Sequence, residues 1–170
     1  MKYQLLFLLL LILGGYTQEC EGQNKFRPLK EFNNDTMAYM NKNYDSGSLY
    51  VDKTIGHVLD DAEIPFKSYV IAETRDCSPA IGFIILFTQS AEEVRALFKA
   101  GKPVYGVFCD FEGGYCNIFI KRELYEILVN LGTNRFNDLK KSDAKVLKDI
   151  KINWAEFRDQ KGWCSMYKVE

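Results

Sequence analysis

The hydrophobic pattern is most distinctive between residues 81 and 120. Phe83–Phe87 is continuously apolar instead of alternating, and it is bounded by Gly82 and Ser90. This pattern is typical of a strand that is covered on both faces or lies in the middle of a sheet. Two further apolar runs, Pro103–Cys109 and Tyr115–Ile120, read as strands as well. We expect these three segments to form the centre of one sheet.

A helix is predicted between the first two of these strands. Ser90 and Glu93 have the spacing of a capping box, and Gly101 followed by Pro103 ends the helical pattern. The residues that fall on one helical face are Ala91, Val94, Leu97 and Phe98. A strand, a helix and a strand in succession predict a βαβ unit with a right-handed crossover and parallel, or nearly parallel, strands.

Glu112, Gly113 and Gly114 predict a hairpin turn after the third strand region, because glycine adopts positive φ at little cost. Such a turn would set Cys109 opposite Cys116, close enough for a disulfide. The alternative is a pair of buried thiols.

The rest of the chain alternates between short helical and extended patterns. Asn34 or Asp35 predicts a helix start, although Asn34-Asp35-Thr36 also fits an N-glycosylation acceptor, and Asp52 predicts a second helix start. The inward positions of these two helices are Met37, Met40 and Tyr44, then Ile55, Val58, Leu59 and Ala62. Phe66–Thr74 reads as a strand that pairs with the central one.

Two more helices are predicted towards the C-terminus. The first has Leu124, Ile127, Leu128 and Leu131 on its apolar side and ends at Gly132. The second starts at Asn137-Asp138 or at Ser142, with its lysines facing solvent. Either 152–157 or 163–169 is expected to add an edge strand.

These elements predict a single α+β domain. Its sheet is mixed and four- to five-stranded, contains the βαβ unit and a hairpin, and carries four to five helices. The expected organisation is a signal peptide over 1–17, a flexible lead over 18–31 and the globular domain over 32–170. Aromatic residues make up 14% of the chain and charges of both signs are interspersed, which indicates a folded chain and not a disordered one.

The first residues have the features of an export signal. Lys2 precedes the apolar run Leu5–Leu13, and Gly15 and Thr17 are small residues at the expected cleavage site. The run is too short to span a bilayer, so we expect an exported, periplasmic or extracellular protein with no membrane span after cleavage. A lipid anchor on Cys20 is the minor alternative. The formal net charge of −1 provides no electrostatic case for binding nucleic acid.

Export makes disulfides chemically possible, and all five cysteines follow the predicted leader. If Cys109 pairs with Cys116, then Cys77 with Cys164 is the next pair by elimination, which leaves Cys20 free. Cys20 with Cys164 is the alternative.

The region from Phe32 to Tyr69 resembles short exported proteins of unknown function from Bacteroides-type bacteria. The residues that carry the resemblance are Phe32-Asn33-Asn34-Asp35-Thr36, Tyr39, Asn43-Tyr44, Tyr50, Lys53-Thr54-Ile55 and Ile64-Pro65-Phe66-Lys67-Ser68-Tyr69. The resemblance implies a periplasmic or outer-surface location and no particular activity.

Few residues suggest chemistry. His57 is the only histidine, so a hydrolase would have to use it as the base for a cysteine or serine nucleophile, although a structural or surface histidine is the more common case. The chain has no Cys-x-x-Cys, no helical histidine pair and no EF-hand loop, so no metal or other cofactor is predicted.

One ligand site has a physical argument. In a βαβ unit, ligands collect beside the carboxyl ends of the parallel strands and the helix N-terminus. Here that position predicts Thr88, Gln89, Ser90 and Asp110. Loop solubility and helix capping explain the same residues.

The absence of a catalytic signature favours a non-enzymatic domain that binds a protein or glycan partner through loops and exposed aromatic residues. The alternatives are a hydrolase that uses His57, and an envelope-maintenance protein without a ligand.

Overall fold

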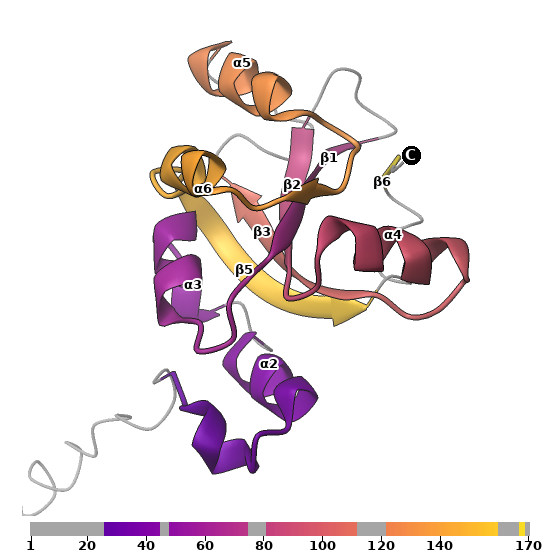
Figure 1. Ribbon diagram of the computed structural model, residues 1–170. Coiled ribbons are helices and arrows are strands. Elements are labelled where there is room, and N and C mark those ends of the chain that lie inside the picture. The colour runs from indigo at the N-terminus through magenta and orange to yellow at the C-terminus, as the bar shows by residue number, and fades with distance from the viewer. Residues whose placement is uncertain (1–25, 45–47, 75–80, 112–121, 160–166, 169–170) are drawn as a thin grey trace, which may run out of the picture.

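The computed structural model describes residues 26–44, 48–74, 81–111, 122–159 and 167–168 (Figure 1). These residues form one sheet with helices packed on it, which confirms the predicted single α+β domain. The strand order is β4-β1-β2-β3-β5, and β6 pairs with β1 away from this path. The strands are β1 (Ser68–Thr74), β2 (Ile81–Phe87), β3 (Tyr105–Phe111), β4 (Asn137–Asp138), β5 (Ile152–Asp159) and β6 (Tyr167–Lys168).

All pairs between these strands are antiparallel, so the prediction of a parallel βαβ unit is wrong. Phe83 pairs with Asp110 and Leu86 pairs with Val107, which means that β2 and β3 run in opposite directions. The chain leaves β2 and enters β3 at the same end of the sheet. The helix between them, α4 (Ala91–Lys99), therefore does not carry the chain along the length of the strands. The predicted pairing of β1 with β2 is confirmed.

The apolar run of β2 is buried on both faces, as its sequence predicts. Ile84 and Leu86 contribute to one core cluster, and Phe83, Ile85 and Phe87 contribute to the other. A β-bulge opposite Ala72 and Glu73 brings Ile81 into the cluster of Ile84. A strand that supplies both cores needs a neighbour on each edge, and β2 has β1 and β3.

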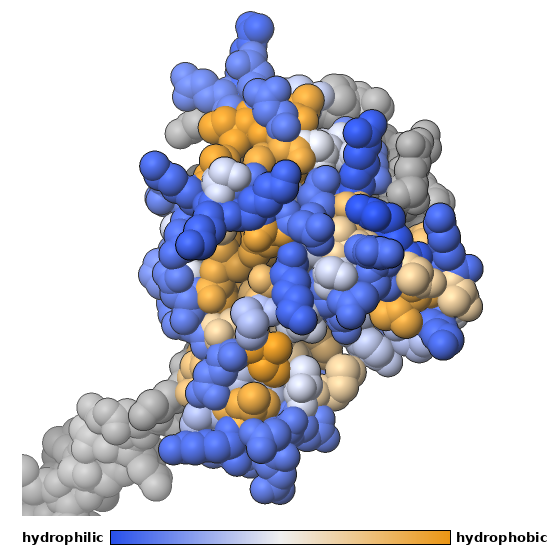
Figure 2. Space-filling view, in the orientation of Figure 1, coloured by the Kyte–Doolittle hydropathy of each residue, from blue (hydrophilic) through white to orange (hydrophobic). Residues whose placement is uncertain are grey.

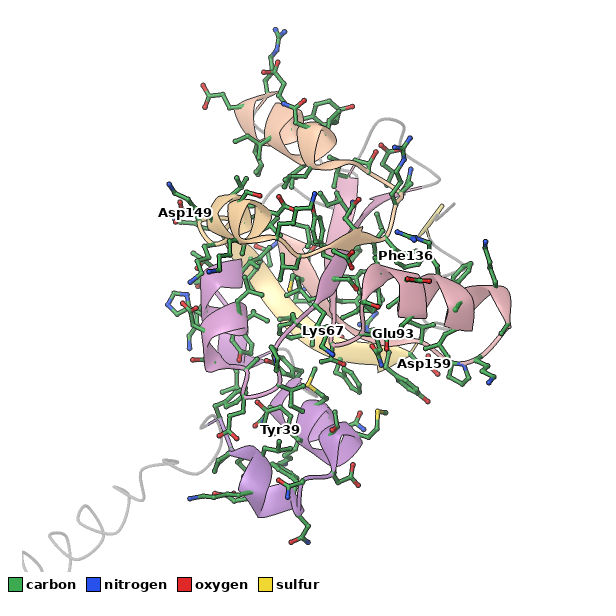
Figure 3. The ribbon with its side chains drawn as sticks, in the orientation of Figure 1. Tyr39, Lys67, Glu93, Phe136, Asp149 and Asp159 are labelled. Carbon is green, nitrogen blue, oxygen red and sulfur yellow. The ribbon has the colours of Figure 1, made fainter. Side chains whose placement is uncertain are left out.

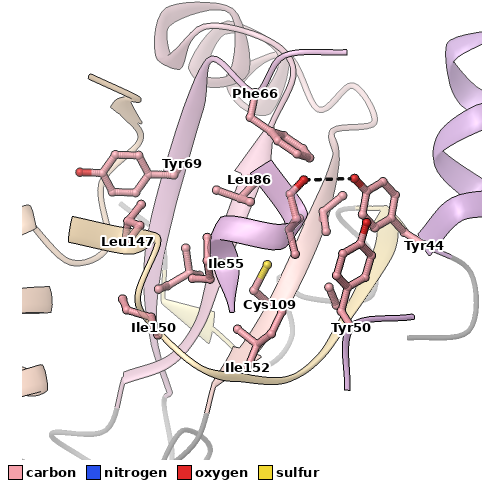
Figure 4. Packing of buried hydrophobic residues seen from close by; sticks show 14 of the residues in the cluster. Tyr44, Tyr50, Ile55, Phe66, Tyr69, Leu86, Cys109, Leu147, Ile150 and Ile152 are labelled. Carbon is pink, nitrogen blue, oxygen red and sulfur yellow. Dashed lines mark hydrogen bonds between the residues drawn. The ribbon is translucent and has the colours of Figure 1, made fainter. Parts of the chain in front are cut away.

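The larger core cluster lies between one face of the sheet and most of the helices. These helices are α2 (Thr36–Tyr44), α3 (Ile55–Asp61), α5 (Arg122–Leu131) and α6 (Lys141–Leu147), with the 3-10 turns η1 (Leu29–Phe32) and η2 (Ser48–Tyr50). Aromatic residues dominate the end near α2, where the rings of Tyr44 and Tyr50 stack with centroids 5.5 Å apart (Figure 4). Cys109, Ile55 and Ile152 belong to the same cluster.

The second face is covered by α4. Ala91 and Val94 are buried there, and Leu97 and Phe98 pack against the same cluster, as the predicted apolar face requires. The Ser90–Glu93 capping box is present at its start. At its end Gly101 has a φ of 64°, a left-handed conformation that favours glycine.

Other helix starts differ from the predictions in detail. Of the two residues predicted to start α2, Asn34 and Asp35, it is Asp35 that caps the helix. Its carboxylate accepts from the backbone amides of Met37 and Ala38. Met37 is 39% exposed, so its predicted inward position is wrong. Thr54, and not Asp52, is the N-cap of α3, and Lys140, and not Ser142, is the N-cap of α6.

The residues from 26 to 32 are packed against the domain, although the predicted flexible lead extends to 31. Asn43 lies buried on α2, accepts from the Arg27 amide at 2.8 Å and donates to the Arg27 carbonyl at 2.9 Å. Phe26 contacts Tyr39 and Tyr44 edge to face. We call residues 26–32 the N-terminal strap.

Candidate functional site

The N-terminus of α4, the predicted ligand position, is occupied by the protein's own groups. Glu93 accepts from the Ser90 amide at 2.8 Å and from the Ser90 hydroxyl at 2.9 Å. These bonds from Ser90 hold the pKa of Glu93 below its usual value. The Ala91 amide donates to a carboxylate oxygen of Asp138 at 2.9 Å. Two carboxylates thus already satisfy the positive end of this helix.

The neighbouring predicted residues have structural partners as well. The Ser68 hydroxyl donates to the Gln89 carbonyl at 2.7 Å, and the Thr88 hydroxyl lies 3.4 Å from the Gln89 side-chain oxygen. Phe136 lies beside α4 (Figure 3), and Arg95 of α4 donates to the Phe136 carbonyl at 2.9 Å. These bonds join β1 to the loop after β2, and α4 to the segment before β4, so the loop from Thr88 to Ser90 has a clear architectural role.

The structure does not bring Asp110 to this position. Asp110 lies opposite Phe83, near the start of β2, whereas Thr88–Ser90 follow the end of β2. The four predicted residues would lie together only if β2 and β3 were parallel. Because the strands are antiparallel, Asp110 and the other three residues are at opposite ends of the sheet.

Asp110 is instead part of a polar and aromatic group on β3 and β5. Its Oδ2 accepts from the Asn153 amide at 2.9 Å, while its Oδ1 is buried without a hydrogen-bond partner. Burial raises the pKa of Asp110, and the bond from Asn153 opposes this shift. Trp154 of β5 lies beside Asp110 in the sheet and contacts the ring of Phe83, with centroids 5.5 Å apart.

His57 is exposed on the first turn of α3. Its Nδ1 lies 3.0 Å from the Thr54 hydroxyl and accepts from the Thr54 amide at 3.3 Å. To accept this hydrogen bond from the Thr54 backbone amide, Nδ1 must carry no hydrogen. The imidazole ring thus forms part of the helix cap. In the described part of the chain, no serine or cysteine side chain forms a hydrogen bond with His57. The predicted hydrolase arrangement therefore gains no support from this contact.

Cys109 is a buried free thiol whose pKa is raised by burial. It has Ile84 as its partner on one side and Ala155 on the other. Both edges of β3 are occupied at this position, and the predicted disulfide from Cys109 is not observed. The predicted hairpin turn and the strand after it lie outside the described residues. Cys116 itself, and Cys20, Cys77 and Cys164 of the other predicted pairs, lie outside the described residues.

No group of three or more His, Cys, Asp or Glu side chains suited to a metal ion occurs among the described residues. None of the helices in the described ranges is long and apolar enough to span a membrane.

The most unusual surface feature is the apolar face of α5. Leu128 is buried, but Ile127 and Val129 on either side of it are each 42% exposed. Successive helix positions differ by about 100°, so Ile127 and Val129 flank the contact that holds the helix to the core. Hydrophobic colour gathers over α5 in the space-filling view, at the edge of the molecule (Figure 2).

Three other apolar side chains of α5 are only partly covered. Leu124, Tyr125 and Leu131 pack against the larger core cluster without being buried by it. We define the α5 surface as Leu124, Tyr125, Ile127, Val129 and Leu131. The predicted inward position of Ile127 is wrong, and the helical pattern did not predict this surface. The signal was present, because Tyr125 and Val129 widen the apolar stripe beyond the width of one buried face.

The exposed large hydrophobic residues of the described chain are all aliphatic. They are Met37, Val51, Ile127, Val129 and Val146. The expectation that exposed aromatic residues would mark a binding surface is therefore not met in this part of the chain.

Comparison of the chain with protein-family models, with curated proteins and with solved structures finds no match. The class that the fold defines is thus a single-domain α+β protein with an antiparallel sheet.

Proposed function

We propose that this chain is an exported, non-enzymatic domain that binds a protein partner through the α5 surface. The exposure of Ile127 and Val129 on a helix with only Leu128 fully buried carries this proposal. Apolar side chains exposed on both sides of a buried helix contact are unfavourable in water, and a partner that covers this helix would remove them from solvent. An amphipathic helix whose apolar face exceeds its core contact is suited to helix-in-groove or helix-on-helix association.

The chemistry of the surface favours a protein partner over a glycan. Sugar rings bind to proteins through aromatic faces and dense hydrogen bonding. The exposed members of the α5 surface, Ile127 and Val129, are aliphatic, and its one aromatic residue, Tyr125, is partly buried against the core. Full burial of an exposed aliphatic side chain contributes roughly 1.5–3 kcal/mol, and covering Ile127 and Val129, which are each 42% exposed, contributes less than half of that.

Site-specific photo-crosslinking in the exporting cell tests the proposal. A photoreactive amino acid at position 127 or 129 is expected to form a discrete adduct with one protein. The photoreactive amino acid at position 130, where the exposed Asn130 lies on the same helix, serves as the matched control. Adding Val129→Lys to the position-127 probe should abolish the adduct, because a charged group would have to be desolvated in the interface.

Two outcomes would contradict the proposal. One is the absence of any discrete adduct from both positions. The other is equal labelling at Asn130, which would indicate nonspecific contact. Circular dichroism of each variant establishes that α5 is still folded. Export is tested separately, by fractionation of cells that express the chain with and without residues 1–17.

A further inference from the structure

The carboxyl group of Asp110 has one satisfied oxygen and one orphaned oxygen. The side chain of Asn153 donates to Oδ2, and Oδ1 is buried with no partner. Asp110 as a whole is only 9% exposed. Burying a polar atom without a hydrogen bond is unfavourable, and burying a charged one is much more so. The charged form of Asp110 is therefore poorly accommodated at this position.

A β-bulge produces this arrangement. Asp110 pairs with Trp154 and Phe111 pairs with Ile152, so Asn153 is the extra residue on β5. A bulge redirects the side chain of the extra residue, and here it places the Asn153 amide on the carboxyl group. The hydrogen bond thus joins β3 to β5 where the regular ladder is interrupted.

Within the described ranges, no positive charge is paired with Asp110. From β2, the paired residue is Phe83. From β5, the charged side chains on this face are Glu156 and Arg158, which form an ion pair with each other. The Arg158 guanidinium lies over the ring of Trp154, 5.2 Å from its centroid. Cys109, the neighbour on β3, is a buried neutral thiol. Among the described residues, no ion pair includes Asp110.

We propose that Asp110 is a pH-dependent latch between β3 and β5. As the neutral acid, it keeps the bond from Asn153 on Oδ2 and buries an uncharged hydroxyl at Oδ1, which costs less than a buried charge, and the two strands are held together at the bulge. When the proton leaves to solvent, a charge with one orphaned oxygen remains between the strands, and this end of the sheet loosens. The latch is a property of the fold and does not depend on the proposed partner of α5.

The direction of the pH effect follows from the raised pKa of Asp110 in the folded chain. An unfolded aspartate titrates near pH 3.9, so the stabilising effect is fully present below about that pH. It is lost as the pH rises through the higher folded-state pKa. Between the two values the unfolding equilibrium constant is expected to rise by up to about tenfold per pH unit from this group alone.

Urea unfolding of the wild type and of Asp110→Asn, from about pH 4 to about pH 8, measures this effect. The unfolding equilibrium constant of the wild type divided by that of Asp110→Asn should increase with pH, because the asparagine side chain of the variant cannot ionise. Asp149→Asn is the matched control. Asp149 is exposed, the substitution changes the same atoms and the same net charge, and the variant should follow the wild-type pH dependence.

A second measurement does not depend on a variant that folds. Carbon-13 NMR of the side-chain carboxyl groups should show Asp110 titrating above the ordinary aspartate value in the wild-type chain. Amide exchange at residues 108–110 and 154–156, corrected for its intrinsic pH dependence, should accelerate over the same range. Titration of Asp110 at the ordinary value, or a wild-type pH slope in Asp110→Asn, would overturn the proposal.

Discussion

Tyr39 and Tyr50 are both buried tyrosines, but their hydroxyl groups are in opposite situations. The Tyr39 oxygen accepts from the Glu63 amide at 2.8 Å, whereas the buried Tyr50 hydroxyl lies beside the Tyr44 hydroxyl and the Asp61 carboxylate without a well-formed hydrogen bond to either. Of Tyr39, Tyr44 and Tyr50, only Tyr44 was predicted from the helical pattern to face inward. All three side chains are buried in the larger core cluster. A residue's spacing indicates which face it occupies, and not whether its polar atoms find partners.

We expect Tyr50→Phe to leave the free energy of unfolding unchanged or slightly increased, because it removes an orphaned polar atom and keeps the ring. Tyr39→Phe should reduce the free energy of unfolding by about 1 kcal/mol, because it leaves the Glu63 amide without its acceptor. Urea unfolding at one pH measures both. A loss in Tyr50→Phe as large as that in Tyr39→Phe would show that the Tyr50 hydroxyl is hydrogen-bonded after all.

At the scale of the elements, local capping signals separate the well-predicted helix from the less well-predicted ones. For α4, the cap, the apolar face and the terminating glycine all lie within the helix or next to it, and each is observed as predicted. For α6, two candidate starts, Asn137-Asp138 and Ser142, were available in sequence, and the helix begins after Lys140. Tertiary contacts explain the difference, since Asn137 and Asp138 are used to pair β4 with β1.

Ser90→Ala is expected to lower the free energy of unfolding by about 1 kcal/mol, because the Glu93 amide loses its capping oxygen. Ser142→Ala is the comparison. The Ser142 hydroxyl donates a hydrogen bond to Asp143 and does not cap α6, so its loss should have a negligible effect. Thermal unfolding measures both variants. Equal losses would mean that Ser142, and not Lys140, begins the helix in solution.

At the scale of the whole molecule, the N-terminal strap is held against the domain by hydrogen bonds to α2 and to Glu63. Asn43 makes two hydrogen bonds to the backbone of Arg27, and the Leu29 amide donates to the Glu63 carboxylate at 2.9 Å. The strap belongs to a region that sequence composition alone assigned to a flexible lead. Its polar residues are compatible with solvent, and only the position of Asn43 on α2 reveals that the backbone has a partner.

Asn43→Ala should release the strap and expose it to trypsin at Lys30. It removes both bonds to Arg27, and we expect a loss of about 2 kcal/mol from the free energy of unfolding. Asn41→Ala, an exposed position on the same helix, is the control and should leave the cleavage rate unchanged. Equal cleavage rates in the wild type and in Asn43→Ala would show that the two bonds do not hold the strap.

The sequence by itself determined the local features of this protein: the doubly buried strand β2, the capped helix α4, and the amphipathic stripe and glycine stop of α5. Each of these depends on hydrogen bonds or side-chain spacing over a few residues, which the order of amino acids specifies directly. The tertiary structure alone decided the antiparallel direction of β3, the separation of Asp110 from Thr88–Ser90 and the exposure of Ile127. These depend on which distant segments meet, and local periodicity is the same for a parallel and an antiparallel neighbour, or for a covered and an uncovered helix face.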